Sequence, residues 1–208
     1  MTAPKRTKIK TACEALSSTD PALARAYEEI GVPDWRARPR AYSTLATTIA
    51  YQQISTRAAA SIWGRVTDAL PEITPVIMLE TTEEDLRALG LSRPKISHLK
   101  SIANAIETDA LNLDRIADSS LEDARKELLA VKGIGPWTAE LFLLYALGEM
   151  DAFPVADVGL MEAHKRLSGA NARMDTKAFT AHAAIWKPYR GVAAHLLWGW
   201  LNAERAKA

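Results

Sequence analysis

The chain has 208 residues, of which 48% are hydrophobic and 25% are charged, and its formal net charge is +1. This length and balance are those of a globular protein with a sizeable core, and they argue against an intrinsically disordered chain. The near-neutral charge sets the chain apart from strongly basic nucleic-acid binders, so any contact with DNA must come from local geometry.

Helical signals recur along the chain and strand signals do not, so we predict an all-α fold. The basic N-terminal stretch is expected to be solvated. Asp20 and Pro21 then form the pattern of an N-cap followed by proline, and they begin a short helix that ends at Gly31. Ser43 is the expected cap of a longer helix, whose apolar residues recur at helical period until Pro71.

The middle of the chain carries two capping boxes, in which a hydroxyl residue is followed by an acid three positions later. The first consists of Thr81 and Glu84, and the second of Ser119 and Glu122. Between them, apolar residues keep helical spacing over residues 94–106. We therefore predict three successive helices in this region.

Residues 132–136, Lys-Gly-Ile-Gly-Pro, predict a tight turn between two helices, the second beginning at Pro136 and running to about Gly148. Gly133 and Gly135 allow positive φ angles and a close approach to the backbone. The amides at the start of the following helix, together with its dipole, favour an anion in the same space. The turn is therefore a candidate phosphate site that positions DNA without reading its sequence. Taken alone, Gly-X-Gly before a helix is also typical of a plain interhelical turn.

Three more helices complete the predicted series. They begin near Asp157, near Asp175 and at Pro188. The sequence contains no internal repeat.

Metal cofactors held by cysteine or histidine, and membrane association, are not expected. The single cysteine, Cys13, cannot form an internal disulfide or hold an iron–sulfur cluster. His98, His164, His182 and His195 show no i+3 or i+4 pairing, so we expect each to be packed or exposed rather than bound to metal. No apolar run is long enough to cross a bilayer, and a cytoplasmic location follows as an expectation.

The segment from Leu128 to Glu140, which reads LLAVKGIGPWTAE, closely resembles the hairpin signature of the helix-hairpin-helix DNA glycosylase superfamily. In that superfamily an essential catalytic aspartate follows the hairpin, and the resemblance gives this role to Asp157. An aspartate there is also a good N-cap, and both roles can hold together. Where lyase-competent members carry a nucleophilic lysine this chain has Trp137, which cannot form a Schiff base. The resemblance thus implies a monofunctional enzyme of the DNA-3-methyladenine glycosylase II branch.

The resemblance also implies DNA and cation contacts. Residues 49–55 are similar to the segment that probes the minor groove, with Gln53 at the wedge position that enters the duplex. A monovalent cation, Na⁺ or K⁺, is expected at hairpin carbonyls when DNA is bound. The expected DNA-binding residues are Gln52, Gln53, Lys132, Gly133, Gly135 and Thr138, and the expected carbonyl ligands are Leu129, Val131 and Ile134.

Residues 186–190 resemble the closing segment of the family, whose first tryptophan lines the pocket for the extruded base. Trp186 is therefore expected to stack on the base, with Trp137 and Tyr189 as further residues of the base pocket. Trp198 and Trp200 are expected to be core residues.

The family pattern predicts two helical lobes, residues 41–150 and residues 1–40 with 151–208, with the catalytic aspartate in an interlobe cleft. Because few residues precede Ala41, we do not expect the extra N-terminal β domain of the better-known bacterial member. Ala156 also replaces an acidic neighbour of the catalytic aspartate, a difference that bears on the substrate range.

The function implied is hydrolysis of the N-glycosidic bond of alkylated purines, such as 3-methyladenine or 7-methylguanine, in duplex DNA during base excision repair. The enzyme is expected to be a monomer associated with a bacterial-type nucleoid. Three alternatives remain: a non-catalytic helix-hairpin-helix DNA-binding protein, a bifunctional oxidised-purine glycosylase, and a helical protein with no nucleic-acid role.

Overall fold

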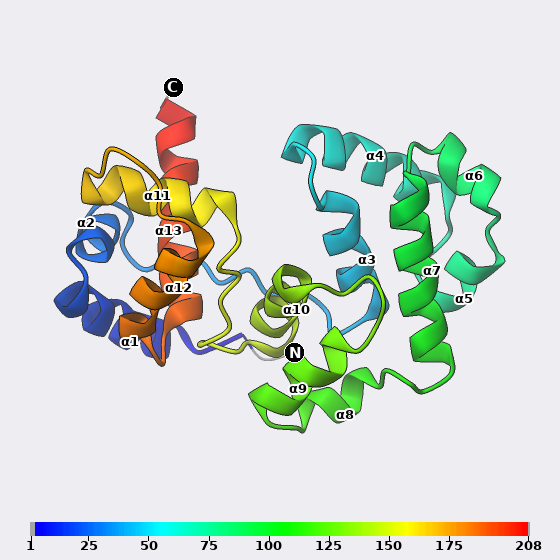
Figure 1. Cartoon of the computed structure of the whole chain (residues 1–208), viewed down its shortest axis with the longest axis horizontal. Coiled ribbons are helices and arrows are strands. Elements are labelled where there is room, and N and C mark those ends of the chain that lie inside the picture. The colour runs from blue at the N-terminus through cyan, green and yellow to red at the C-terminus, as the bar shows by residue number, and fades with distance from the viewer. Residues whose placement is uncertain (1–2, 208) are drawn as a thin grey trace. The chain divides into compact units, whose positions relative to one another are not determined.

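The computed structural model describes residues 3–207, and helices are the only regular structure within them (Figure 1). The predicted all-α class is confirmed. The chain divides into two compact units, residues 1–37 with 147–208 and residues 38–146. The lobe boundaries expected from the sequence fall a few residues away from these. None of the helices within residues 3–207 is long and apolar enough to cross a membrane.

The first unit is built around its last helix. Its elements are α1 (Arg6–Thr19), α2 (Pro21–Ile30), α11 (Val158–Ser168), α12 (Thr176–Ala183), the 3-10 turn η2 (Ala184–Trp186) and α13 (Arg190–Lys207). Helix α13 packs against α1, α2, α11 and η2. Its residues 191–197 are all buried, as expected for a helix that is enclosed on every side. At Gly199 a Cβ would lie 2.7 Å from Ile30 Cδ1, so this glycine permits the close approach of α2.

The basic N-terminal stretch was expected to be solvated, but in the structure it forms helix α1. Ile9, Ala12, Cys13 and Leu16 are buried, and their spacing places them on one face of the helix. This face packs mainly against α2, while the basic residues lie on the exposed side. The apolar face outweighs the tendency of a charged terminus to stay in solvent.

The second unit is built around α7. Its elements are α3 (Tyr42–Tyr51), α4 (Thr56–Ala69), α5 (Pro75–Glu80), α6 (Glu83–Ala88), α7 (Arg93–Glu107), α8 (Leu113–Ala117), α9 (Leu121–Leu129) and α10 (Pro136–Phe142), followed by a π-helical turn η1 (Leu143–Leu147) whose last residue belongs to the first unit. Helix α7 packs against α3, α5 and α6. Its buried residues Ile96, Leu99, Ile102 and Ala103 follow helical period.

The prediction of one long helix from Ser43 to Pro71 is wrong, because the structure has two helices there, α3 and α4. The break has two local causes. Gln53 has a φ of 58°, in the left-handed region that interrupts a helix, and the Ser55 side chain caps α4 by accepting a hydrogen bond from the Ala58 N–H. The apolar period continues through the loop, which is why periodicity alone did not predict the break.

The two predicted capping boxes are each one residue out of place. Thr82 caps α6 by accepting from the Asp85 N–H, and Ser120 caps α9 by accepting from the Asp123 N–H. The final helix begins at Arg190 rather than Pro188. The Arg190 guanidinium forms a paired hydrogen bond with the Asp151 carboxylate, which anchors that end of α13.

Candidate active site

The helix-hairpin-helix lies in the second unit and consists of α9, the turn at residues 130–135 and α10. Arg125 on α9 pairs with Glu140 on α10, and this ion pair fixes the two helices to each other. Gly133 has a φ of 101°, and a Cβ there would lie 2.6 Å from the Cβ of His98. Gly135 is extended instead, with a φ of −87°, so only the first of the two glycines adopts the positive φ that was expected of both.

The loop between α3 and α4 is tied to the hairpin. Gln52 Nε2 donates a hydrogen bond to Thr138 Oγ1 over 2.7 Å, and the Thr138 side chain is buried. Gln53 and Lys132 are exposed on the loop and the hairpin turn. The structure therefore brings together two of the sequence-predicted DNA-binding segments within one unit. The side chains of Gln52 and Thr138 bind each other, and they stabilise this arrangement.

Asp157 lies in the first unit and is the N-cap of α11, as its residue type predicts. Its Oδ1 accepts hydrogen bonds from the Leu160 N–H over 3.1 Å and from Trp198 Nε1 over 3.2 Å. A Cβ at position 159 would lie 3.0 Å from the same oxygen, so Gly159 leaves room for the carboxylate. Donors from two helices thus hold a partly exposed carboxylate in a fixed orientation.

Trp198, which donates to this carboxylate, packs against His195, and His195 in turn stacks on Trp35. Trp35 stacks on the His195 ring at a centroid distance of 4.2 Å, and Trp198 meets the ring edge to face at 6.0 Å. His195 Nδ1 donates to the Gly191 carbonyl, and His195 Nε2 accepts from the Arg36 N–H. Burial lowers the pKa of His195 to about 4, so the ring is neutral at pH 7. His195 is therefore a fixed support for Trp198 rather than a proton acceptor.

This arrangement around Asp157 was not predicted from the sequence. Trp198 was expected to be a core residue, yet it is partly exposed and contacts Asp157. Trp35 was not singled out, because it lies in a connecting segment far from the family motifs. No local pattern links Trp198 to Asp157, since this contact depends on how α11 and α13 pack. Trp200 is buried as expected, and its Nε1 donates to Glu29.

The three predicted base-pocket residues have different environments. Trp186 is 1% exposed, and its ring is enclosed by aromatic side chains that include Phe153 and Phe179. The enclosed ring has no face on which a base could stack, so the structure gives it a core role in place of the expected one. Trp137 on α10 and Tyr189 are partly exposed.

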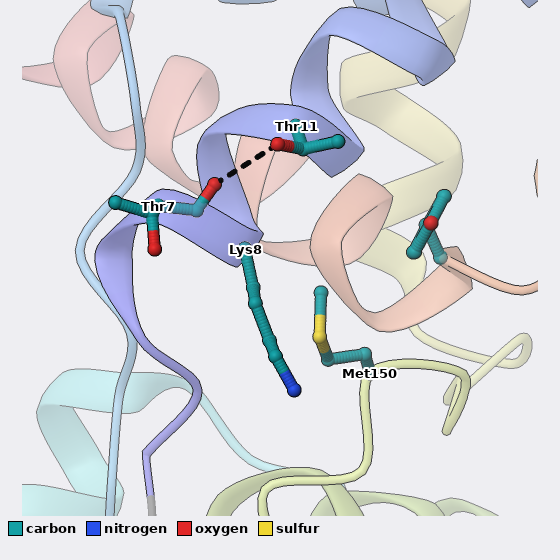
Figure 2. A pocket seen from close by; sticks show the side chains of 5 residues that line it. Thr7, Lys8, Thr11 and Met150 are labelled. Atoms are coloured by element: carbon teal, nitrogen blue, oxygen red, sulfur yellow. Dashed lines mark hydrogen bonds between the residues drawn. The ribbon is translucent and has the colours of Figure 1, made fainter.

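A cavity of about 420 Å³ lies beside α1, and Tyr189 is one of its lining residues. The others are Thr7, Lys8, Thr11 and Met150, of which the first three belong to α1 (Figure 2). The Lys8 side chain extends away from the helix in this view, and Met150 supplies an apolar surface. Among the described residues, Asp157 does not line this cavity, so the cavity is separate from the carboxylate site.

Comparison with known protein families shows which family the chain matches. Residues 46–188 match the model of the HhH-GPD superfamily of base excision DNA repair proteins, which covers more than half of the chain. The chain belongs to the HhH-GPD superfamily. This confirms the resemblance that the hairpin sequence indicated.

Individual superfamily members are similar over most of the chain. DNA-3-methyladenine glycosylase 1 of Schizosaccharomyces pombe is 32% identical over 76% of this chain and 71% of its own length. A solved structure of S. pombe 3-methyladenine DNA glycosylase in complex with abasic DNA superposes with a TM-score of 0.82, at 28% identity, over 90% of this chain and 95% of that one. These names confirm the branch predicted within the superfamily.

The probable bifunctional transcriptional activator/DNA repair enzyme AlkA of Mycobacterium tuberculosis is 34% identical over 71% of this chain. The chain spans only 31% of that relative's length. The shared part therefore corresponds to one portion of a longer superfamily member.

Proposed function

We propose that this chain is a monofunctional DNA glycosylase that hydrolyses the N-glycosidic bond of alkylated purines in duplex DNA. The observation that carries the proposal is the Asp157 carboxylate, held by the Leu160 N–H and Trp198 Nε1 at the N-terminus of α11. Membership of the superfamily and the 3-methyladenine glycosylase names of its similar members support the substrate class.

The chemistry follows from the charge of the carboxylate. Breaking the glycosidic bond leaves positive charge on the sugar, and an anion fixed nearby stabilises that transition state without having to reorganise. Base release also requires the nucleotide to leave the base stack, at a cost of about a few kcal/mol. The exposed Gln53 on the loop after α3 is the proposed wedge that fills the gap. Its left-handed backbone conformation is of the kind that clusters at functional sites.

Selection of alkylated purines is proposed to rest on charge. Methylation at N3 or N7 makes the purine cationic, which both improves the leaving group and attracts an aromatic face. Trp198 lies beside Asp157, but the Arg36 guanidinium already lies over its ring at 5.8 Å. Trp137 and Tyr189, which are partly exposed, are therefore the aromatic candidates for the base pocket. Stacking on Trp186 would require the core around it to open.

The hairpin is proposed to hold a DNA phosphate. Gly135 is the N-cap of α10 and has no side chain to cover the first amides of the helix. A Cβ built at Gly135 would have no other atom within 4 Å, so the space in front of these amides is open. Carbonyl oxygens suit a Na⁺ or K⁺ ion, and the Val131 carbonyl keeps a lone pair after accepting from the Ile134 N–H. Leu129, Val131 and Ile134 would hold such an ion. It would supply positive charge toward the phosphate.

The experiment that tests this function is product analysis with treated DNA. Duplex DNA methylated with a simple alkylating agent is incubated with the protein, and the released material is separated by chromatography. We expect free 3-methyladenine or 7-methylguanine, and no covalent adduct trapped by borohydride. Binding to the duplex without base release would indicate a non-catalytic DNA-binding protein, and a trapped adduct would indicate a lyase.

Trp198→Phe tests the positioning role of the indole. The substitution keeps an aromatic ring but removes the Nε1 donor to Asp157, so we expect base release to slow about 10- to 100-fold, as for a hydrogen bond of about 1.5–3 kcal/mol to a charged group. Affinity for an abasic duplex should stay unchanged. Rates are measured under single-turnover conditions.

Trp200→Phe is the matched control, because Trp200 lies two residues further along α13 and donates to Glu29 instead. It should lower the unfolding midpoint slightly and leave the rate of base release at the parent value. Equal rate losses in the two variants would mean that Trp198 acts only through the stability of α13.

A further inference from the structure

Three side chains of the first unit form a second cluster that uses none of the residues around Asp157. Asp20 is the N-cap of α2, His164 lies on α11, and His182 lies in the last turn of α12. One ligand atom from each lies within 4.8 Å of the others. Sequence spacing does not indicate this cluster, because spacing rules find metal ligands on one helix and these residues come from three segments.

The distances fit a metal ion of the zinc type. Asp20 Oδ2 lies 2.8 Å from His182 Nε2 and 3.5 Å from His164 Nε2. Ligand atoms about 2.0–2.1 Å from a tetrahedral Zn²⁺ are roughly 3.3 Å apart, which lies between these two values. A carboxylate with two imidazoles is also a ligand set that zinc accepts, with a fourth position left for water.

His164 supplies a second, independent observation in favour of a bound ion. Its Nε2 atom is buried and, within residues 3–207, has no hydrogen-bond partner in the structure. The contact of 3.5 Å with Asp20 is too long for a good hydrogen bond. A buried polar atom without a partner is unfavourable by about 1–3 kcal/mol, so an ion bound here would satisfy an atom that the protein itself does not.

The Asp20 carboxylate is held as metal-binding carboxylates usually are. Its Oδ1 accepts from the Ala22 N–H, and its Oδ2 accepts from Trp186 Nε1. Such outer hydrogen bonds orient the ligand.

We propose that Asp20, His164 and His182 bind one divalent transition-metal ion, of which Zn²⁺ is the best match. The ion would join α2, α11 and α12 and so stabilise the first unit. The His182 side chain is 28% exposed, so the cluster is open to solvent on that side. The proposal is independent of the glycosylase function, because it involves no DNA.

The test is a titration of untagged, EDTA-treated protein with Co²⁺, which reports its coordination through visible absorption. We expect one Co²⁺ per chain, displacement by Zn²⁺ but not by Mg²⁺, and a thermal unfolding midpoint that rises with Zn²⁺ concentration. His182→Gln should lower the affinity on the order of 10- to 100-fold or more, because it removes a ligand at a partly exposed position.

The control is His98→Gln, which removes a histidine of the second unit and should leave the Co²⁺ spectrum unchanged. Asp20→Asn provides a second variant, since asparagine preserves the N-cap while removing the charge. Circular dichroism checks that each variant is folded. Absence of a saturable Co²⁺ spectrum in the parent protein, or equal Co²⁺ affinity in folded His182→Gln, would overturn the proposal.

Discussion

Asp157→Asn is expected to abolish most base release while the protein still folds and binds DNA. Asparagine caps helices as well as aspartate does, so α11 should begin at the same residue. The neutral amide cannot stabilise positive charge on the sugar, and we expect a rate loss of at least about 10²- to 10³-fold, the scale seen when a preorganised electrostatic group is removed. Single-turnover base release from a 3-methyladenine duplex measures the rate.

Two further variants separate charge from structure at this site. Asp157→Glu keeps the charge but moves it by one methylene, and we expect partial activity. Asp175→Asn makes the same change at the N-cap of α12, which is also capped by an aspartate side chain, and should not alter the rate. Parent-level base release in Asp157→Asn would remove this carboxylate from the mechanism.

Asp20→Ala is expected to have the largest effect on stability. The Asp20 carboxylate accepts hydrogen bonds from Trp186 Nε1 at 2.9 Å and from the Ala22 N–H at 2.8 Å, and it pairs with His182. Alanine would leave these buried groups without an acceptor and remove the cap of α2. We expect a loss of about 3–5 kcal/mol in the free energy of unfolding, measured by urea denaturation in EDTA so that no metal contributes.

The pH dependence gives an independent check of the same carboxylate. The pKa of Asp20 is lower in the folded state than in the unfolded state. The contribution of the carboxylate to the free energy of unfolding is therefore fully present above the unfolded-state pKa of about 3.9, and it is lost as the pH falls through the lower folded-state pKa. The stability difference between the parent protein and Asp20→Asn should therefore shrink below about pH 4. A difference that stays constant from pH 7 to pH 3 would contradict this account. Asp34→Asn, at an exposed position, is the control.

The sequence predicted the features that depend on neighbouring residues. Asp20, Asp157 and Asp175 cap the helices that were expected to begin beside them. The capping boxes near residues 81 and 119 were misplaced by one position, because each site has two adjacent hydroxyl residues with acids three positions later. Local sequence does not distinguish such neighbours, and the choice depends on packing.

The contacts that build the candidate sites join residues far apart in the chain. Trp198 reaches Asp157 across 41 positions, and His182 reaches Asp20 across 162. Neither contact leaves a trace in periodicity or spacing. The family resemblance located Asp157, because members of a family keep the same residue at the same place in the fold. It did not predict which donor orients the carboxylate, or that Trp186 is buried.

The most direct test of the central claim uses one duplex with a single 3-methyladenine. The parent protein and Asp157→Asn are incubated with it at saturating protein, and alkali then converts each abasic site into a strand break. We predict complete, alkali-dependent cleavage for the parent and almost none for the variant, with equal binding of both to an abasic duplex. Cleavage at the same rate by both proteins, or none by either, would contradict the assignment of this chain as a glycosylase that works through Asp157.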